Sequence, residues 1–464
     1  MRRHFIKYIY SGIFGISFFL CLKIAIPSPA ESIDTLDSEI TKKYQKIILE
    51  EPSNLNAHFN LGILYYRNAL FDEAVREFRK VLDINPNDSE AYYNLGNIFN
   101  KKNLFDDAID SYKKAAAINP NDAGIFHNLG NAYAGKGMID DAISSYKKAI
   151  EINPNLAESH KSIAYLYRKM GQTTESIQSF EKASKVNSKD ITMLLDLASA
   201  YESNGSQDHA IHTYRRILSI DPDNKNTKNR LAMLCNNKGV SLALQGKSDE
   251  AISAYKEALQ NKEDFKEVYN NLGAVYVDKG MIDDAIATYK KAIKISPNFG
   301  EAYNNLGVAF TKKKNYDEAV SAFKKTLSLN KNHAGAHFNL GVVYSEKGMA
   351  SEAIDEYNEA LRLTPNDLST LYNRGVLYIQ SGRLNDATAD MKKMIEINPK
   401  VSAAHHKLGD VYQKQGHFDD AIAEYKRALE ISPDLKEALT SLEDTYRLKE
   451  KKAKNQGSRG IRKR

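Results

Sequence analysis

The chain has no tryptophan and only two cysteines, Cys21 and Cys235, among its 464 residues. Two cysteines cannot form the disulfide framework of a small secreted domain, and no C-x-x-C pair is present for metal or redox chemistry. The sequence also lacks an HExxH pair, a Walker A loop and the GxGxxG and GxSxG turns of common enzyme sites. We therefore predict no metal, no cofactor and no catalytic residue.

Charge is missing from an apolar run at the N-terminus, residues 9–22. Basic residues precede this run and a small-x-small pair follows it: Arg2, Arg3, Lys7, Ser28 and Ala30. Such a segment is typical of a secretory signal peptide, and the run is shorter than the ~20 residues of a spanning helix. We predict that residues 1–30 are a signal peptide and that the rest is exported to the periplasm or cell envelope. The alternative is an uncleaved membrane anchor running to Ile26, with the repeats outside the cytoplasm.

A 34-residue pattern fills most of the remaining sequence, recurring eleven times between Leu55 and Pro433. One copy shows every position of the pattern: Tyr269, Leu272, Gly273, Tyr276, Ala285, Tyr289, Ala292 and Pro297. The first four of these residues and the next three fall on two separate helical stripes, so each repeat predicts two helices. Four histidines stand at the position of Tyr269 in other repeats, and we interpret them as packing residues: His58, His160, His337 and His405.

In period and residue pattern this array resembles the tetratricopeptide repeat family. The resemblance implies an all-α fold, a right-handed superhelix (an α-solenoid) of about eleven helix-turn-helix repeats. It also implies a scaffold that binds protein or peptide segments rather than an enzyme. Gly273 and Ala285 then mark places where neighbouring backbones come close, because a larger side chain there would overpack the repeat.

The turn between the two helices has its own residue signals. Eight repeats place glycine at one position, which predicts a left-handed residue after the first helix. These are Gly137, Gly171, Gly205, Gly246, Gly280, Gly348, Gly382 and Gly416. Three residues later, all eleven repeats have a residue that favours helix N-caps, and we expect it to cap the second helix. These residues are Asp72, Asp106, Asp140, Thr174, Asp208, Asp249, Asp283, Asp317, Ser351, Asn385 and Asp419.

The register of the repeats divides the chain into segments. Residues 31–54 match a second-helix half repeat, followed by repeats 1–5 (55–224) and repeats 6–11 (232–435). The inserted residues 225–231 predict a longer loop or a helix extension, with a joint between two rigid halves as the alternative. Residues 436–448 match a first helix, and we expect it to be a polar-faced cap that ends the core.

The positive charge of the chain lies at its ends. The whole chain carries +6, residues 1–30 carry +4 and residues 449–464 carry +7, so residues 31–448 are left with −5. We predict a disordered basic tail from Lys449 to Arg464. An adaptor that binds nucleic acid or an acidic polymer through this tail is one alternative function. Acidic residues on the repeats, such as Glu267 and Glu301, make nucleic acid an unlikely partner of the solenoid itself.

A row of asparagines is the candidate binding site. One asparagine precedes the Leu-Gly position in eight repeats: Asn60, Asn94, Asn128, Asn237, Asn271, Asn305, Asn339 and Asn373. In tetratricopeptide arrays this position faces the concave groove. The row resembles the asparagine ladder in the superhelix of O-linked N-acetylglucosamine transferases, which holds an extended peptide by its backbone. An asparagine amide offers both a donor and an acceptor, and therefore matches a peptide group.

These observations predict an exported scaffold that binds extended protein segments in a concave groove and assists assembly of a cell-envelope complex. Two alternatives stay open beside the basic-tail adaptor. The asparagines can instead orient local packing within each repeat, and the chain can be a non-catalytic repeat subunit associated with a glycosyltransferase. Membrane association through residues 1–26 belongs to the anchor alternative.

Overall fold

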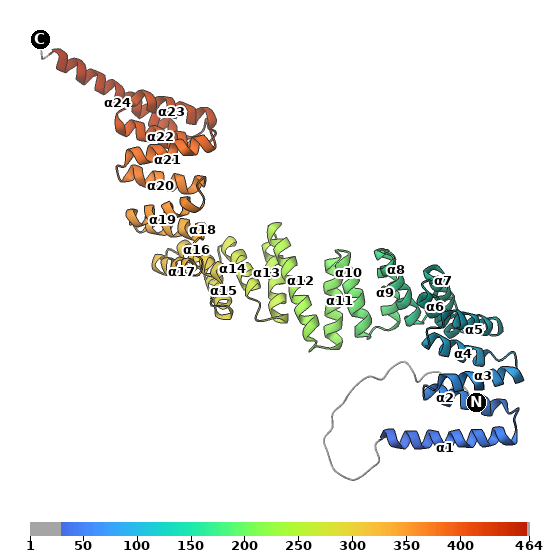
Figure 1. Cartoon of the computed structure of the whole chain (residues 1–464). Coiled ribbons are helices and arrows are strands. Elements are labelled where there is room, and N and C mark those ends of the chain that lie inside the picture. Colours follow the sequence, from blue (N-terminus) through green and yellow to red (C-terminus); the bar gives the residue numbers. More distant parts are fainter. Residues whose placement is uncertain (1–28, 462–464) are drawn as a thin grey trace, which may run out of the picture. The chain divides into compact units, whose positions relative to one another are not determined.

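The computed structural model describes residues 29–461, so nearly all of the predicted signal segment lies outside the described residues. In this part of the chain every regular element is an α-helix. The predicted all-α helical repeat fold is confirmed. The chain divides into two compact units, unit 1 (Met1–Asn204) and unit 2 (Gly205–Arg464), and each unit is a stack of helical hairpins (Figure 1).

The helices follow the predicted order of half repeat and repeats. Unit 1 contains α1 (Pro29–Glu50), α2 (Leu55–Arg67), α3 (Phe71–Ile84), α4 (Ser89–Lys101), α5 (Phe105–Ile118), α6 (Ala123–Lys136), α7 (Ile139–Ile152), α8 (Ala157–Lys169), α9 (Thr173–Val186) and α10 (Ile191–Ser203). Unit 2 begins with α11 (Gln207–Ile220), α12 (Lys225–Leu244), α13 (Ser248–Asn261), α14 (Lys266–Asp278), α15 (Ile282–Ile295), α16 (Gly300–Lys312) and α17 (Tyr316–Leu329). It continues with α18 (Ala334–Glu346), α19 (Ala350–Leu363), α20 (Leu368–Gln380), α21 (Leu384–Ile397), α22 (Ser402–Gln415), α23 (Phe418–Ile431) and α24 (Lys436–Ile461).

Close packing within a repeat depends on the glycine of the first helix. In the repeat formed by α14 and α15, the Tyr289 ring is buried against Gly273. A Cβ atom added to Gly273 would lie 2.5 Å from Cε1 of that ring, closer than carbon atoms can approach. The prediction that a larger side chain would overpack the repeat at this glycine is confirmed, but the close neighbour is the Tyr289 ring rather than a backbone.

The turn between the helices is left-handed, as predicted. All eight glycines of the turn have φ between 73° and 85°. In the three other repeats with this turn, Ala69, Asn103 and Lys314 adopt φ of 57°, 58° and 62° at the same position. The backbone of the turn is thus kept even where a side chain makes the left-handed conformation costly.

The predicted N-caps of the second helices are wrong. The second helix starts two residues after the left-handed residue, so α3 is capped by Leu70 and Asp72 is its second residue. The cap residue makes no side-chain hydrogen bond there, and the same holds for the other second helices of the repeats. Side-chain caps occur on first helices instead, as where Asp88 accepts from the backbone of Ala91 at 2.9 Å. The acidic residues still lie in the first turn, where they suit the positive helix end.

Seven of these aspartates form ion pairs with the following repeat. Each accepts from a lysine 30 residues later, which lies at the end of the next first helix or, for Lys238 and Lys449, within α12 and α24. The pairs are Lys102–Asp72 (2.7 Å), Lys136–Asp106 (2.5 Å), Lys238–Asp208 (2.6 Å), Lys313–Asp283 (2.5 Å), Lys279–Asp249, Lys347–Asp317 and Lys449–Asp419. The aspartates are exposed, so each pair contributes only about 0–1 kcal/mol. The shared 30-residue offset of these ion pairs indicates that the repeats joined by them stack in the same way.

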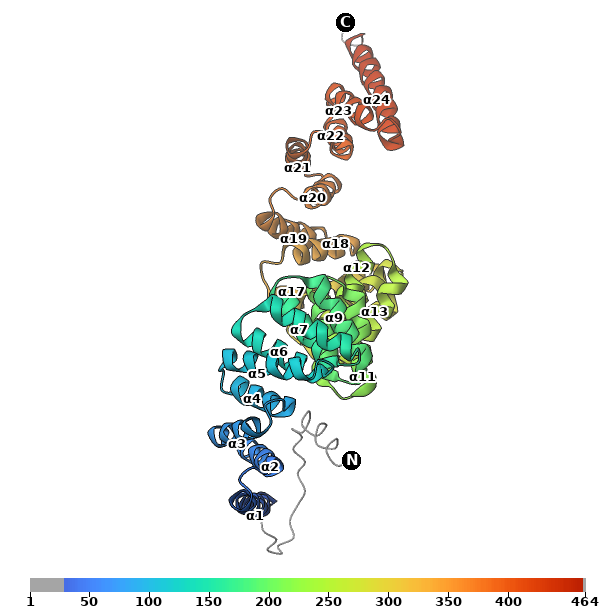
Figure 2. The ribbon, with the colours of Figure 1, turned by 90° about the vertical axis from the view of Figure 1, so that its right-hand side faces the viewer.

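First helices line the inner side of each stack. In unit 2, α12 contacts α14, α14 contacts α16, and the same continues through α18, α20, α22 and α24. In unit 1, α4 contacts α6 in the same way. Elements on the inner side of a curved stack lie closest together, so the first-helix residues form the concave surface of each unit. Figure 2 shows the successive hairpins from α18 to α23.

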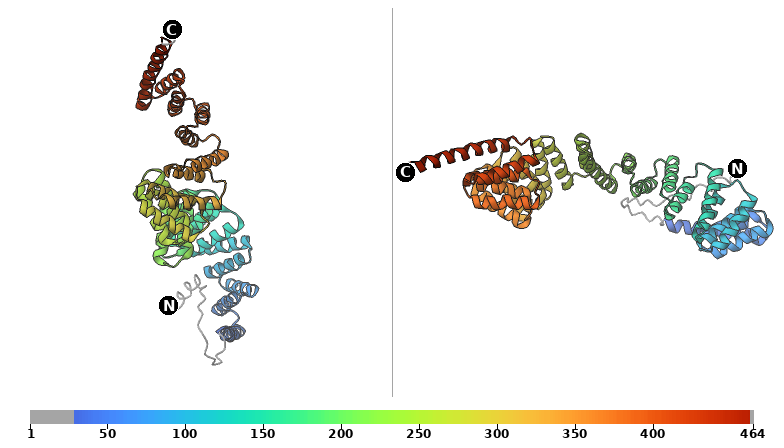
Figure 3. Two further views of the ribbon diagram at one scale, coloured as in Figure 1. Left: turned by 90° about the vertical axis from the view of Figure 1, so that its left-hand side faces the viewer. Right: turned by 90° about the horizontal axis from the view of Figure 1, so that it is seen from above.

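The insertion and the C-terminal tail are both helical. The inserted residues 225–231 lengthen α12 to 20 residues, which confirms the interpretation as a helix extension, and they lie inside unit 2. The prediction of a disordered tail from Lys449 is wrong as far as Ile461, because α24 continues to that residue. Figure 3 shows this helix running past the helices on which it packs. Lysine, glutamate and alanine favour a helix, which explains why the two glycines do not end it earlier.

The predicted polar face of the C-terminal cap is also wrong. Leu439, Tyr446 and Leu448 on α24 are all more than a third exposed. α24 thus carries apolar side chains, as do the first helices that pack against a second helix. Among the described residues, no helix is long and apolar enough to cross a membrane.

Candidate functional site

The eight asparagines of the row all lie on first helices and all reach the surface. They are carried by α2, α4, α6, α12, α14, α16, α18 and α20, in the order Asn60, Asn94, Asn128, Asn237, Asn271, Asn305, Asn339 and Asn373. Asn60 and Asn237 are exposed, and the other six are half-buried. These asparagines are therefore carried by the helices that line the concave side of the stack.

Three asparagines of unit 2 share one geometry. Each donates from its side-chain amide nitrogen to an asparagine oxygen of the preceding repeat: Asn271 to Asn236 (3.1 Å), Asn305 to Asn270 (3.0 Å) and Asn339 to Asn304 (3.3 Å). The partner stands 35 residues earlier in every case. These bonds fix the direction of the amide plane, so the three carbonyl oxygens are set in one repeated orientation.

The asparagines of unit 1 are held differently. Asn94 donates to the backbone oxygen of Glu90 in its own helix at 2.8 Å. Asn128 donates to the Tyr93 hydroxyl at 2.8 Å and to Asn97 at 3.0 Å, so its donors are used within the repeats. Asn271, Asn305 and Asn339 thus share one donor geometry, and in unit 1 Asn128 keeps the same 35-residue offset with the Tyr93 hydroxyl as its acceptor.

The partner asparagines were not singled out by the sequence analysis. Asn270 and Asn304 come directly before the row residue, as the first letter of an Asn-Asn-Leu-Gly run. That doubled asparagine is a signal in the sequence. The hydrogen bond that this asparagine makes depends on which residue of the neighbouring repeat faces it. The stacking register between repeats determines that residue.

The histidines at the aromatic position connect the two helices of a repeat. The Nδ1 atoms of three histidines lie 2.6 Å from a glutamate of the second helix: His58 from Glu77, His337 from Glu356 and His405 from Glu424. Their Nε2 atoms lie 3.0–3.2 Å from a backbone oxygen six residues earlier. Both ring nitrogens are thus engaged within the repeat, which agrees with the packing interpretation.

No reactive centre stands out among the described residues. Burial raises the pKa of the Cys235 thiol to about 12, so the reactive thiolate is disfavoured. No group of three histidine, cysteine or acidic side chains within residues 29–461 is placed to hold a metal ion. A pocket among α13, α14 and α15 has both signs of charge in its lining, including Lys256, Glu263 and Lys291, and contains none of the eight asparagines.

Comparison with known proteins places the repeats in a family. The family model described as the cilia and flagella-associated protein 70 C-terminal domain, a tetratricopeptide repeat domain, matches residues 33–242 and again 236–444. The chain belongs to this tetratricopeptide repeat family. Its fold is typical of non-catalytic scaffolds for protein interaction. The two matches together begin in α1 and end in α24, so both terminal helices belong to the array. No curated protein matches the sequence.

Several solved structures are similar to parts of the array. MamA is 30% identical over 35% of this chain and 95% of its own length, with a TM-score of 0.33. YrrB, a tetratricopeptide repeat protein with an unusual peptide-binding site, is 23% identical over 40% of this chain and 97% of its own, with a TM-score of 0.37. A chain of the Cut9–Hcn1 hetero-tetramer is 17% identical over 90% of this chain and 94% of its own, with a TM-score of 0.40. The resemblance of the asparagine row to O-linked N-acetylglucosamine transferases stays a prediction.

Proposed function

We propose that this tetratricopeptide repeat protein is an exported scaffold that holds an extended polypeptide segment by its backbone along the asparagine row of unit 2. Such a scaffold would assist assembly of a cell-envelope complex. The observation that supports the proposal is the repeated geometry of Asn271, Asn305 and Asn339 on the concave side.

The inter-repeat hydrogen bonds suit these asparagines to backbone recognition. Each bond occupies a donor of the amide group; the oxygen of Asn305 also accepts from Asn304 at 3.4 Å, and an amide oxygen can accept a second hydrogen bond. A peptide N–H is the matching donor, and it is present at every residue except proline. Because the amides are already oriented, binding does not have to order them, which lowers the entropic cost of association.

Replacing Asn271, Asn305 and Asn339 together by Ala should weaken binding of an extended peptide. Each lost hydrogen bond costs about 0.5–1.5 kcal/mol, so the three together should raise the dissociation constant roughly tenfold or more. The probe is a peptide selected on the purified chain from a random-sequence library, with affinity measured by fluorescence polarisation. An N-methylated version of the same peptide lacks the backbone donors and should bind the unchanged protein equally poorly.

The matched control replaces the partners Asn236, Asn270 and Asn304 by Ala. This triple variant loses the same inter-repeat hydrogen bonds and should lose similar thermal stability, but it keeps the row oxygens. Equal loss of affinity in both triple variants would mean that the row serves local packing. Binding that instead fails on removal of residues 453–464, and fades steeply with salt, would favour the basic-tail adaptor.

Export has its own test. The mature protein should begin near Glu31 and be recovered from the cell envelope, because residues 1–30 have the features of a cleaved signal peptide. Intact-mass measurement on protein purified from cell fractions reads the N-terminus directly. Retention of residues 2–22 would move the assignment to a membrane anchor, and recovery from the soluble cytosol would contradict both.

A further inference from the structure

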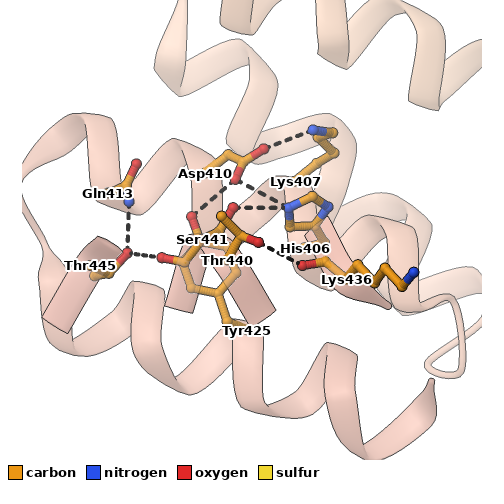
Figure 4. A network of polar contacts seen from close by, with 9 residues as sticks. All are labelled: His406, Lys407, Asp410, Gln413, Tyr425, Lys436, Thr440, Ser441 and Thr445. Carbon is orange, nitrogen blue, oxygen red and sulfur yellow. Dashed lines mark hydrogen bonds and ion pairs between the residues drawn. The ribbon is translucent and has the colours of Figure 1, made fainter. Parts of the chain in front are cut away.

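The last helix, α24, occupies the position of a first helix in a twelfth repeat. His406 lies 3.3 Å from the Ser441 hydroxyl, the same 35-residue offset that joins Asn236 to Asn271 (Figure 4). Lys449 pairs with Asp419, the 30-residue offset of the other inter-repeat ion pairs. No second helix follows α24 within the described residues.

The helix α1 occupies the complementary position, that of a second helix, and no first helix pairs with it within residues 29–461. Gln45 donates to the Tyr65 hydroxyl at 3.1 Å, an offset of 20 residues. The same offset places Lys113 over the Tyr133 ring in a complete repeat. The half repeat predicted from the sequence is therefore in register with the array, and α1 packs on α2.

Both terminal helices expose the face that a partner helix covers elsewhere. Tyr446 is 42% exposed, whereas Tyr276 at the same repeat position is 8% exposed. Leu439 on the same helix is 50% exposed. On α1, Tyr44 is half-buried, whereas its counterpart Tyr289 is 2% exposed.

We propose that α24 of one copy packs against α1 of a second copy, so that the two half repeats form one complete repeat between chains. The occupant of each open face is then another copy of this protein. A helix with first-helix register then meets a helix with second-helix register, and neither has a partner helix of that kind within the described residues. The contact is head-to-tail, so repetition gives either an open filament or a closed ring.

Charge supports this pairing at the centre of the contact. The residue of α24 at the glycine position is Glu443, which is exposed. In the repeat of α20 and α21, a Cβ added at the glycine position, Gly375, would lie 3.4 Å from Cβ of Asp390. The residue of α1 at the position of Asp390 is Lys43, also exposed. A joined repeat would thus bring a glutamate of one copy beside a lysine of the other.

Charge also agrees at the ends of the two helices. Helices of one repeat run antiparallel, so the C-terminal end of α24 would lie beside the N-terminal end of α1. Lys451 is exposed near the first of these ends, whereas the neighbouring Lys452 is held by its own chain, donating to the Gly416 backbone oxygen at 3.3 Å. By sequence, the beginning of α1 carries Glu31, Asp34 and Asp37 and no basic residue. Both helices are also longer than those of a typical repeat, with 26 and 22 residues against 13 and 14 in α14 and α15.

Reversing the charge of Glu443 or of Lys43 tests the proposed contact. The purified full-length chain, with residues 1–30 retained, should show masses in multiples of 52.1 kDa that grow with concentration in analytical ultracentrifugation. Glu443→Lys and Lys43→Glu should each weaken association by about tenfold or more, because each sets like charges together. A mixture of the two single variants should assemble again, since every contact then joins opposite charges.

Glu430→Lys, an exposed change of the same kind on α23, is the matched control and should leave assembly unchanged. Tyr446→Asp should abolish assembly while the melting temperature changes little. A single 52.1 kDa species at all concentrations would overturn the proposal. So would assembly that persists in Tyr446→Asp, or single charge variants that fail to recover on mixing.

Discussion

Replacing Asp390 by Ala should lower the free energy of unfolding of its repeat by about 3–5 kcal/mol, because it leaves a largely buried charge without its partner. Asp390 is 4% exposed and accepts two hydrogen bonds from Arg374, at 2.9 and 2.6 Å. Arg374 stands where most other repeats have leucine, and its third hydrogen bond is to Asn358 at 2.6 Å. Chemical denaturation followed by circular dichroism measures the loss, and hydrogen exchange of α20 and α21 locates it.

Two further variants distinguish the loss of the Arg374–Asp390 ion pair from a general effect of removing a charge. Asp386→Ala breaks an exposed ion pair with Arg383 and should change stability by no more than about 0.5–1 kcal/mol. The double change Arg374→Leu and Asp390→Thr restores the residue types of the α14–α15 repeat and should recover much of the loss. A loss in Asp390→Ala no larger than in Asp386→Ala would show that the pair contributes nothing to stability.

Tyr289→Ala should cost about 3–5 kcal/mol, because it opens a cavity where the ring fills the space beside Gly273. Gly273→Ala should cost about 1–3 kcal/mol for the opposite reason, since its methyl group meets the ring. Thermal unfolding and hydrogen exchange measure both effects. Protection should fall most in α14, α15 and their neighbours, because each repeat of a solenoid contacts only the next.

The double variant Gly273→Ala, Tyr289→Ala tests whether the two single changes act on the same space or destabilise the repeat independently. With the ring removed, the new methyl group has room, so the double variant should cost less than the sum of the single changes. Tyr269→Ala is the control, since that ring is only half-buried. Strict additivity in the double variant would mean that the ring does not occupy the space of the glycine.

Contacts within one repeat were predictable because they recur at fixed spacing in the sequence. The helix pair, the left-handed turn and the fit of Tyr289 on Gly273 all follow from residues repeated every 34 positions. Periodicity reports which face of a helix is buried, and glycine reports where the backbone needs φ above zero. These features are decided locally, so a single sequence is sufficient for them.

Contacts between repeats were not predictable in the same way. Asp72 has the residue type of an N-cap, yet it pairs with Lys102, because the turn starts the helix two residues earlier. The orientation of Asn271 depends on Asn236 in the preceding repeat, and Tyr446 is exposed because no second helix covers α24 within residues 29–461. The sequence by itself determined the repeat, its two helices and the candidate row. The stacking register between repeats decided which side chains meet, because that register depends on the packing of whole helices rather than on local residue preference.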